Sequence, residues 1–280
     1  YGLVGESGCG KSTLGRSVLR LFDITDGEIE FAGQDIAKMS DKQLKPLRRR
    51  MQAIFQDPYS SLNPGMTVAQ LIAEPMKIHG YGKQQRETRT LELLEKVGLK
   101  AEHLNRFPHE FSGGQRQRIS IARALSVNPE FVLCDEPLSA LDVSVQAQVV
   151  NILQDLQQAL GLTYLFIAHD LSMVRHISDR IGVMYLGTLV EEAPAETLYT
   201  EPAHPYTRAL LASIPVADPH VQMLDQGGIK GELPSAMSDW PGCKFCNRCP
   251  RAMDKCQSQS PVMQEISPGH RVACWLFENS

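Results

Sequence analysis

Long apolar runs are missing from this chain of 280 residues. Its apolar stretches, such as FVLC at 131–134, fall far short of the roughly 20 residues that a membrane-spanning helix needs. A strong net charge is missing too, because the formal charge at pH 7 is −4. The whole-chain charge therefore favours neither nucleic acid nor an anionic lipid surface as a partner. With 42% apolar and 21% charged residues, the composition is typical of a globular protein.

Cysteine is scarce over most of the chain. Cys9 and Cys134 stand alone, whereas the other five of the seven cysteines lie between Cys243 and Cys274. Scattered thiols suit a reducing compartment, and a terminal cluster there favours a metal or an iron–sulfur centre over disulfides.

An initiator methionine and a signal peptide are also missing. The chain starts with YGLVGESG, which reads as the middle of a strand-to-loop segment. We therefore expect that residues precede Tyr1, and that the chain is an N-terminally truncated fragment of a cytoplasmic protein.

A phosphate-binding loop stands near the start of the sequence. Residues 5–12, GESGCGKS, match G-x-x-x-x-G-K-[ST] and lie between a short apolar strand and a helix expected over 11–22. In such a loop the backbone N–H groups surround nucleotide phosphates, the lysine adds positive charge, and the hydroxyl after it ligates Mg²⁺. An ordinary glycine-rich turn is the alternative. The expected nucleotide-binding residues are Gly5, Glu6, Ser7, Gly8, Cys9, Gly10, Lys11, Ser12 and Thr13, with Ser12 also on Mg²⁺.

The rest of the chain alternates between helical and strand patterns. GEIEFAGQDI at 27–36 predicts a strand, and apolar spacing of three and four predicts several helices within 60–128. The runs EFVLCDEP and TYLFIAHD predict buried parallel strands, joined by a long helix over 144–161. After about Pro215 the chain becomes rich in Pro, Gly and Cys, which indicates a domain boundary near 216–235.

Acidic and histidine residues follow those two strands, where the carboxyl ends of parallel strands place a site. We expect Asp135 to hold the Mg²⁺ shell through water and Glu136 to accept a proton from the attacking water. His169 would reach a terminal phosphate or orient Glu136. The alternatives are an acidic strand end that caps the next helix and a purely structural histidine.

A second phosphate-binding pattern occurs at 111–118, FSGGQRQR. A serine and two glycines open a predicted helix, which is how a chain presents bare backbone N–H groups to a phosphate. One nucleotide site does not need two such loops within one chain.

Together the motifs resemble the ATPase subunit of ABC transporters. The resemblance rests on GESGCGKS at 5–12, FSGGQ at 111–115, CDEP at 134–137, SALD at 139–142 and His169, in this order. It implies an α/β P-loop NTPase core of RecA-like type with a parallel sheet, an inserted helical subdomain and a small Cys-rich extension. The implied domains are an ATP-binding core of 1–58 and 129–215, a helical subdomain of 59–128 and an extension of 216–280.

The resemblance also explains the second loop. In this family two ATPase domains pair head to tail, and each ATP lies between the Walker A loop of one subunit and the signature motif of its partner. Ser112, Gly113, Gly114 and Gln115 would thus bind the partner's nucleotide, and Asp142 of SALD would cross the dimer interface.

Two further family features concern residues outside these loops. Gln56 in FQDP matches the glutamine that contacts Mg²⁺ or the water and links to the transmembrane partner, although a surface turn residue before Pro58 is the alternative. The aromatic residue that stacks on adenine lies upstream of Walker A in this family, and Tyr1 is too close to the loop to replace it.

The tail narrows the resemblance to importers of oligopeptides and dipeptides, a pattern that nickel importers largely share. The match rests on FQDPYSSLNP at 55–64, HPYTRALLASIP at 204–215 and the cysteines of 242–274. Some members bind a [4Fe–4S] cluster through four sulfurs, and Cys246 is a fifth thiol that competes for a place. Structural zinc or no metal are the alternatives. The matching sulfurs are those of Cys243, Cys249, Cys256 and Cys274.

The resemblance implies a translocase subunit that uses ATP and Mg²⁺ to power peptide import from the cytoplasmic face of the inner membrane. Its implied partners are a second, identical or related ABC ATPase subunit, two permease subunits and a substrate-binding protein, with no nucleic acid. A nickel importer ATPase is one alternative. A soluble ABC ATPase acting on ribosomes or DNA is another, disfavoured because the chain has one motif set and no coiled-coil insertion. A redox-sensing subunit with a vestigial ATP site is disfavoured by the intact Lys11, Asp135, Glu136 and His169.

Overall fold

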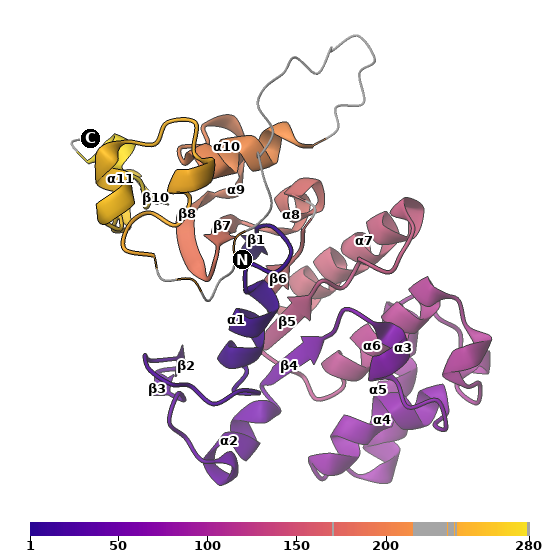
Figure 1. Cartoon of the computed structure of the whole chain (residues 1–280). Helices are drawn as coiled ribbons and strands as arrows, with labels where there is room; N and C mark the ends of the chain where they lie inside the picture. The colour runs from indigo at the N-terminus through magenta and orange to yellow at the C-terminus, as the bar shows by residue number, and fades with distance from the viewer. Residues whose placement is uncertain (170, 215–233, 235–237, 239, 279–280) are drawn as a thin grey trace. The chain divides into compact units, whose positions relative to one another are not determined.

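The computed structural model describes residues 1–169, 171–214, 234, 238 and 240–278. It divides the chain into two compact units. The first unit comprises residues 1–11 and 168–280, and the second comprises residues 12–167. Both contain strands and helices, which confirms the expected α/β class (Figure 1).

Three parallel strands form the sheet of the second unit. They are β4 (Met51–Ile54), β5 (Phe131–Asp135) and β6 (Thr163–Ile167), and β5 pairs with both of the others. The middle residues of β5 are fully buried, as a central parallel strand covered on both faces requires, and this explains their continuous apolar run. Helix α7 (Val143–Leu160) joins β5 to β6 and completes the β-α-β unit that the sequence predicts.

A group of helices makes up most of the segment between β4 and β5. Helices α4, α5 and α6 lie side by side, and α3 packs on α6 (Figure 1). Most of their periodic apolar residues are buried, with Ile78 and Leu91 as exposed exceptions, and the segment is helical as predicted. The elements are α3 (Pro58–Ser61), α4 (Val68–Ile78), α5 (Lys83–Lys96), η1 (Ala101–His103), η2 (Pro108–Glu110) and α6 (Gly113–Leu125).

Helix α1 (Lys11–Val18) is shorter than the helix expected over 11–22. Arg20 has a left-handed backbone with a φ of 54°, which ends the helical path. Its guanidinium donates hydrogen bonds to the carbonyls of Ile36 at 3.1 Å and Met39 at 3.2 Å. Leu19, Leu21 and Phe22, which continue the apolar spacing of the helix in the sequence, therefore lie beyond its end.

The single strand expected over 27–36 was wrong. The segment forms a small hairpin of β2 (Glu30–Phe31) and β3 (Gln34–Asp35), followed by α2 (Asp41–Arg48). Ala32 and Gly33 have φ values of 51° and 76°, so both loop residues take the left-handed conformation of a tight two-residue hairpin turn.

The first unit has a mixed sheet. Strand β1 (Gly2–Val4) is parallel to β7 (Arg180–Tyr185), and β7 is antiparallel to β8 (Thr188–Pro194). Strand β10 (His270–Val272) pairs antiparallel with β8 and with β9 (Gln264–Ser267). The Cys-rich extension thus continues the sheet of the preceding strands.

Short helices accompany these strands. None of the helices within the described ranges is both long and apolar enough to cross a bilayer. The elements are α8 (Leu171–Ile177), α9 (Ala195–Thr200), α10 (Pro205–Ala212), η3 (Cys246–Arg248), α11 (Asp254–Ser258) and η4 (Trp275–Phe277).

Aromatic packing joins the extension to the rest of the first unit. The rings of Tyr185 on β7, Tyr206 on α10 and Phe245 pack mutually, with centroids 4.8–5.3 Å apart. All three side chains are almost completely buried, and such aromatic contacts contribute about 0.5–1.5 kcal/mol per pair beyond area burial. The extension therefore shares a core with β7 and α10.

A buried carboxylate adds a polar anchor in the same unit. Glu191 on β8 accepts hydrogen bonds from the backbone N–H groups of Ala203 at 2.7 Å and His204 at 2.8 Å. It also contacts Nε2 of His270 on β10 at 2.7 Å. His204 itself caps α10, because its Nδ1 accepts from the Tyr206 N–H, and burial lowers the pKa of His204 to about 4. The HPYT segment therefore contributes packing and capping.

Candidate functional site

The phosphate loop connects β1 to α1 through three left-handed glycines. Gly5, Gly8 and Gly10 have φ values of 152°, 81° and 105°. A Cβ at Gly5 would lie 2.2 Å from the carbonyl oxygen of Met184, so the loop passes the end of β7 where a side chain has no room. Helix α1 begins at Lys11, and the N–H groups of its first turn have no acceptor within the helix. This arrangement suits an anion.

Lys11 lies inside the loop that precedes it. Its side chain is buried, and Nζ donates hydrogen bonds to the carbonyls of Gly5 at 2.8 Å and Glu6 at 3.0 Å. Ser7 and Gly8 are exposed, and burial raises the pKa of Cys9, which keeps that thiol neutral. The loop therefore holds one cation among its backbone groups, with its tip open to solvent.

Glu6 has more contacts than its place in the motif suggests. Its backbone N–H donates to the hydroxyl of Tyr206 at 2.9 Å. Its carboxylate accepts two hydrogen bonds from Arg248, at 2.8 and 2.9 Å, in a forked ion pair. Sequence reasoning missed both partners, because HPYT is a weak signal and no pattern marks an arginine between two cysteines.

Asp135 ends β5 and is buried, with one oxygen paired. Its Oδ2 accepts from Nε of Arg16 at 3.2 Å and from Nη2 at 3.1 Å. Its Oδ1 is buried and has no hydrogen-bond partner within the described residues. An unpaired buried carboxylate oxygen at a strand end fits a hard cation such as Mg²⁺. Arg16 on α1 is a further site residue that the motif pattern did not reveal.

The structure brings Glu136 and Gln56 together, a contact that the sequence analysis did not predict. They follow the neighbouring strands β5 and β4, and Gln56 Nε2 donates to Glu136 Oε2 at 3.0 Å. Glu136 has a left-handed backbone with a φ of 48°, while its N–H donates to the carbonyl of Ile167. A non-glycine residue in this conformation costs free energy and is typical of functional sites, where the turn directs the side chain.

His169 lies two residues beyond the end of β6, which stops at Ile167. The strand is therefore shorter than the segment LFIAH that the sequence predicts. The His169 side chain is exposed, and the preceding Ala168 N–H donates to the Leu3 carbonyl at 3.3 Å. Its contact with a phosphate or with Glu136 stays a prediction.

The signature segment caps α6. Ser112 Oγ accepts from the Gln115 N–H at 3.3 Å, and Gln115 Oε1 accepts from the Ser112 N–H at 3.1 Å. This capping box leaves the N–H groups of Gly113 and Gly114 without intrahelical acceptors. A Cβ at Gly114 would lie 2.3 Å from Cγ1 of Val145, so glycine permits the close packing of α6 on α7.

A cavity of about 630 Å³ opens beside this helix start. Ser112, Gly114 and Gln115 line it together with basic residues, among them Lys100 and Arg118. The lining also includes one acidic residue, Glu102. A helix start with bare N–H groups beside cationic side chains can bind a polyanion. The walls come from the second unit alone.

Asp142 caps the neighbouring helix α7. Its Oδ1 accepts from the Val145 N–H at 3.0 Å and from the Ser144 hydroxyl at 2.8 Å. The hydrogen bond from Val145, followed by that from Ser144, lowers the pKa of Asp142. Its place at a dimer interface stays a prediction.

The five cysteines of the extension are free thiols. The Cys243 N–H donates to the Cys256 carbonyl at 2.7 Å, and burial raises the pKa of Cys243 to about 11. Thiols are suitable ligands for zinc or iron–sulfur clusters, so the donor chemistry fits. Within the described residues, no group of three or more histidine, cysteine, aspartate or glutamate side chains is placed so that it could hold a metal ion.

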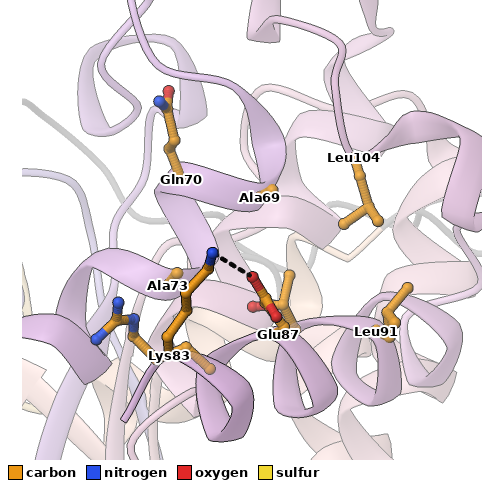
Figure 2. A pocket seen from close by; sticks show the side chains of 9 residues that line it. Ala69, Gln70, Ala73, Lys83, Glu87, Leu91 and Leu104 are labelled. Atoms are coloured by element: carbon orange, nitrogen blue, oxygen red, sulfur yellow. Dashed lines mark ion pairs between the residues drawn. The ribbon is translucent and has the colours of Figure 1, made fainter. Parts of the chain in front are cut away.

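Another cavity, of about 440 Å³, lies between α4 and α5 (Figure 2). Ala69, Ala73 and Leu91 give it largely aliphatic walls. Its acidic residue Glu87 pairs with Lys83 of the same helix at 3.9 Å, and both are mostly exposed. Its lining, within the described residues, includes no residue of the phosphate loop or of the signature segment.

Comparisons with known proteins agree with this geometry. The model of the family "ABC transporter" matches residues 1–139, and that of "Oligopeptide/dipeptide transporter, C-terminal region" matches residues 190–256. A solved dimeric post-hydrolysis state of the ATP-binding cassette MJ0796, bound to ADP and Pi, superposes with a TM-score of 0.63 at 30% identity, covering 69% of this chain and 84% of that chain. The fold and the phosphate loop thus define a P-loop ATPase of the ATP-binding cassette type.

Relatives with higher sequence identity identify a narrower family within this class of ATPases. The putative oligopeptide transport ATP-binding protein YkfD of Bacillus subtilis is 57% identical over 100% of this chain and 86% of its own length. The oligopeptide transport ATP-binding protein OppF of the same organism is 65% identical over 78% of this chain and 72% of its own length. A putative peptide import ATP-binding protein of Brucella ovis is 53% identical over 98% of this chain and 86% of its length. The chain belongs to the family of oligopeptide transport ATP-binding proteins, the ATPases of ABC transporters.

Proposed function

We propose that the chain powers the import of oligopeptides or dipeptides by hydrolysing ATP at the cytoplasmic face of the cell membrane. The observation that carries the proposal is the union, in one chain, of the cassette motifs with the oligopeptide/dipeptide C-terminal region. The proposed partners are a second ATPase subunit, two permease subunits and a substrate-binding protein. The ATPase would bind to the permeases peripherally.

At the level of residues, we assign the phosphates of ATP to the loop Gly5–Thr13. Lys11 and the N–H groups of the first turn of α1 neutralise their charge. Ser12, Gln56 and Asp135 would hold Mg²⁺, which neutralises phosphate charge when bound. The unpaired Oδ1 of Asp135 supports its role.

The hydrolytic step falls to Glu136. Its carboxylate would accept a proton from the attacking water as the oxygen of that water bonds to the γ-phosphorus and the bond to the β-phosphate oxygen breaks. Gln56, which donates to Glu136 Oε2, orients this carboxylate. His169 is assigned to the terminal phosphate, beyond the end of β6.

The signature segment has a separate role. We assign Ser112, Gly113, Gly114 and Gln115 to the nucleotide bound by a partner subunit, and Asp142 to the interface of that dimer. The capped helix start supports this assignment, as does the cavity beside it, which Lys100 and Arg118 line, since both could bind phosphates. The solved relative MJ0796 is itself dimeric with ADP and Pi.

Uptake by cells tests the transport proposal. Deleting the gene should abolish uptake of a labelled tripeptide, and the full protein supplied in trans should restore it. Permease subunits should co-purify with the protein from detergent-solubilised membranes. Loss of nickel uptake with peptide uptake unchanged would instead support a nickel importer, and co-purification with ribosomes alone would support a non-transport ATPase.

We also propose that Cys243, Cys249, Cys256 and Cys274 bind a [4Fe–4S] cluster, with Cys246 as an alternative ligand. The chemistry of five thiols within one extension supports it. Protein purified without oxygen should be brown and contain iron and sulfide. Cys256→Ser should lose the iron, whereas the matched Cys134→Ser in β5 should keep it. A colourless protein that contains zinc would contradict the cluster.

A further inference from the structure

Glu6 of the phosphate loop forms an ion pair with Arg248, which belongs to the same unit but lies far along the chain. Arg248 follows Glu6 by 242 positions, yet its Nη1 and Nη2 donate to Glu6 Oε2 at 2.8 Å and Oε1 at 2.9 Å. The Arg248 side chain is 6% exposed and that of Glu6 25% exposed. A forked, largely buried pair of this kind fixes both position and orientation, unlike a solvent-exposed one.

Glu6 connects that arginine to the loop's lysine. Its carbonyl accepts from Lys11 Nζ at 3.0 Å, its N–H donates to the Tyr206 hydroxyl at 2.9 Å, and its carboxylate binds Arg248. All polar groups of one loop residue are therefore engaged. A displacement of its side chain would move the carbonyl that holds Lys11.

A second contact from the extension holds the other side of the loop. Lys244 Nζ donates to the carbonyl of Leu186 at 2.7 Å, in the turn between β7 and β8. The next residue in that turn, Gly187, donates its N–H to the carbonyl of Cys9 at 2.8 Å. Phe245, which follows Lys244 directly, is buried against the rings of β7 and α10. The extension thus contacts the loop directly at Glu6 and, through the turn between β7 and β8, indirectly at Cys9.

From these contacts we propose that Arg248 is a positioning residue for ATP binding, which holds the phosphate loop in its binding shape through Glu6. The inference rests on the assignment of ATP to Gly5–Thr13. It gives the Cys-rich extension a direct part in nucleotide affinity: a change that moves the turn Cys246–Arg248 changes the fit of the loop. Because the pair organises the loop that binds the phosphates, its effect falls on ATP affinity and little on kcat.

Equilibrium binding of Mg·ATP to the full chain, in a Glu136→Gln background that prevents turnover, tests the proposal. Arg248→Gln should weaken binding about 10-fold, in line with the loss of a charge-assisted hydrogen-bonded pair. Arg248→Lys keeps the charge but loses the fork, so it should lie between Arg248→Gln and the parent. Arg251→Gln is the matched control, since Arg251 is exposed in the same segment, and it should bind ATP like the parent.

A double-mutant cycle separates this role from general destabilisation. If Arg248 acts through Glu6, then Arg248→Gln should add little to the effect of Glu6→Gln on ATP affinity. ATPase rates of the assembled transporter should show a raised KM for ATP with kcat nearly unchanged. Affinity equal to the parent in Arg248→Gln, additive effects in the cycle, or the same loss in Arg251→Gln would each overturn the proposal.

Lys11→Ala in the same assay distinguishes the two levels of inference. If Lys11→Ala lost ATP binding while Arg248→Gln bound ATP like the parent, only the role of Arg248 would be rejected. Retained ATP binding in Lys11→Ala would reject the assignment of ATP to the loop itself.

Discussion

Replacing Glu136 with glutamine is expected to lower the rate of ATP hydrolysis by about 10²–10⁴-fold, the usual contribution of a general base. Glutamine is nearly isosteric, and its amide oxygen can still accept the hydrogen bond that Gln56 donates at 3.0 Å. It cannot accept a proton from water. ATP binding should therefore persist, and ATP-bound dimers should accumulate.

Phosphate release measures the rate, and light scattering with ATP measures the dimer. Glu130→Gln is the matched control, because Glu130 lies just before the other end of β5 and pairs with Arg50. That pair is partly exposed, so its loss should leave turnover close to normal. Hydrolysis by Glu136→Gln at the parental rate would exclude Glu136 as the base.

Replacing Ser112 with arginine should stop hydrolysis while ATP still binds to the phosphate loop. The bulky cation would occupy the start of α6, where the N–H groups of Gly113 and Gly114 are assigned to a partner's phosphates. The loop Gly5–Thr13 belongs to a different part of the same chain and should keep its affinity. We expect turnover to fall by about 10²-fold or more, as when a donor to transition-state charge is removed.

The substitution also removes a helix cap, which costs about 0.5–2 kcal/mol in helix stability. Thr67→Arg provides the control, since Thr67 caps α4 through the same kind of capping box with Gln70. It should show a similar loss of thermal stability with hydrolysis retained. If Ser112→Arg lost ATP binding, the signature segment would act on its own chain's nucleotide. Full ATPase activity in a strictly monomeric sample would also mean that no partner's signature segment is needed.

Much of the fold was predictable because its signals are local and periodic. The run FVLC lies in a central parallel strand with Val132, Leu133 and Cys134 fully buried, and the helices of 60–128 bury most of their apolar residues at helical spacing. The errors occurred where backbone conformation changes over one or two residues. The positive φ values of Arg20, Ala32 and Gly33 end a helix and turn a strand into a hairpin, and the apolar pattern carries no signal for them.

The parts of the candidate site that lie within short sequence motifs were predictable. Gly5 lies between β1 and α1 and Lys11 begins α1, which is the strand–loop–helix context that the motif at 5–12 expects. The contact between Gln56 and Glu136 is a finding of the structure. The arginine partners of Asp135 and Glu6 were not predictable. Each pairs with a residue more than a hundred positions away, and arginines are common on protein surfaces.

By itself the sequence determined the chemistry of this protein: a phosphate loop, a strand-end pair of carboxylates and a capped glycine helix start, each defined by consecutive residues whose backbone preferences are local. Tertiary structure alone decided what holds these pieces in place. The fork of Arg248 on Glu6 and the burial of Asp135 with one unpaired oxygen depend on distant segments that pack together, and packing is set by shape and burial that no short pattern records.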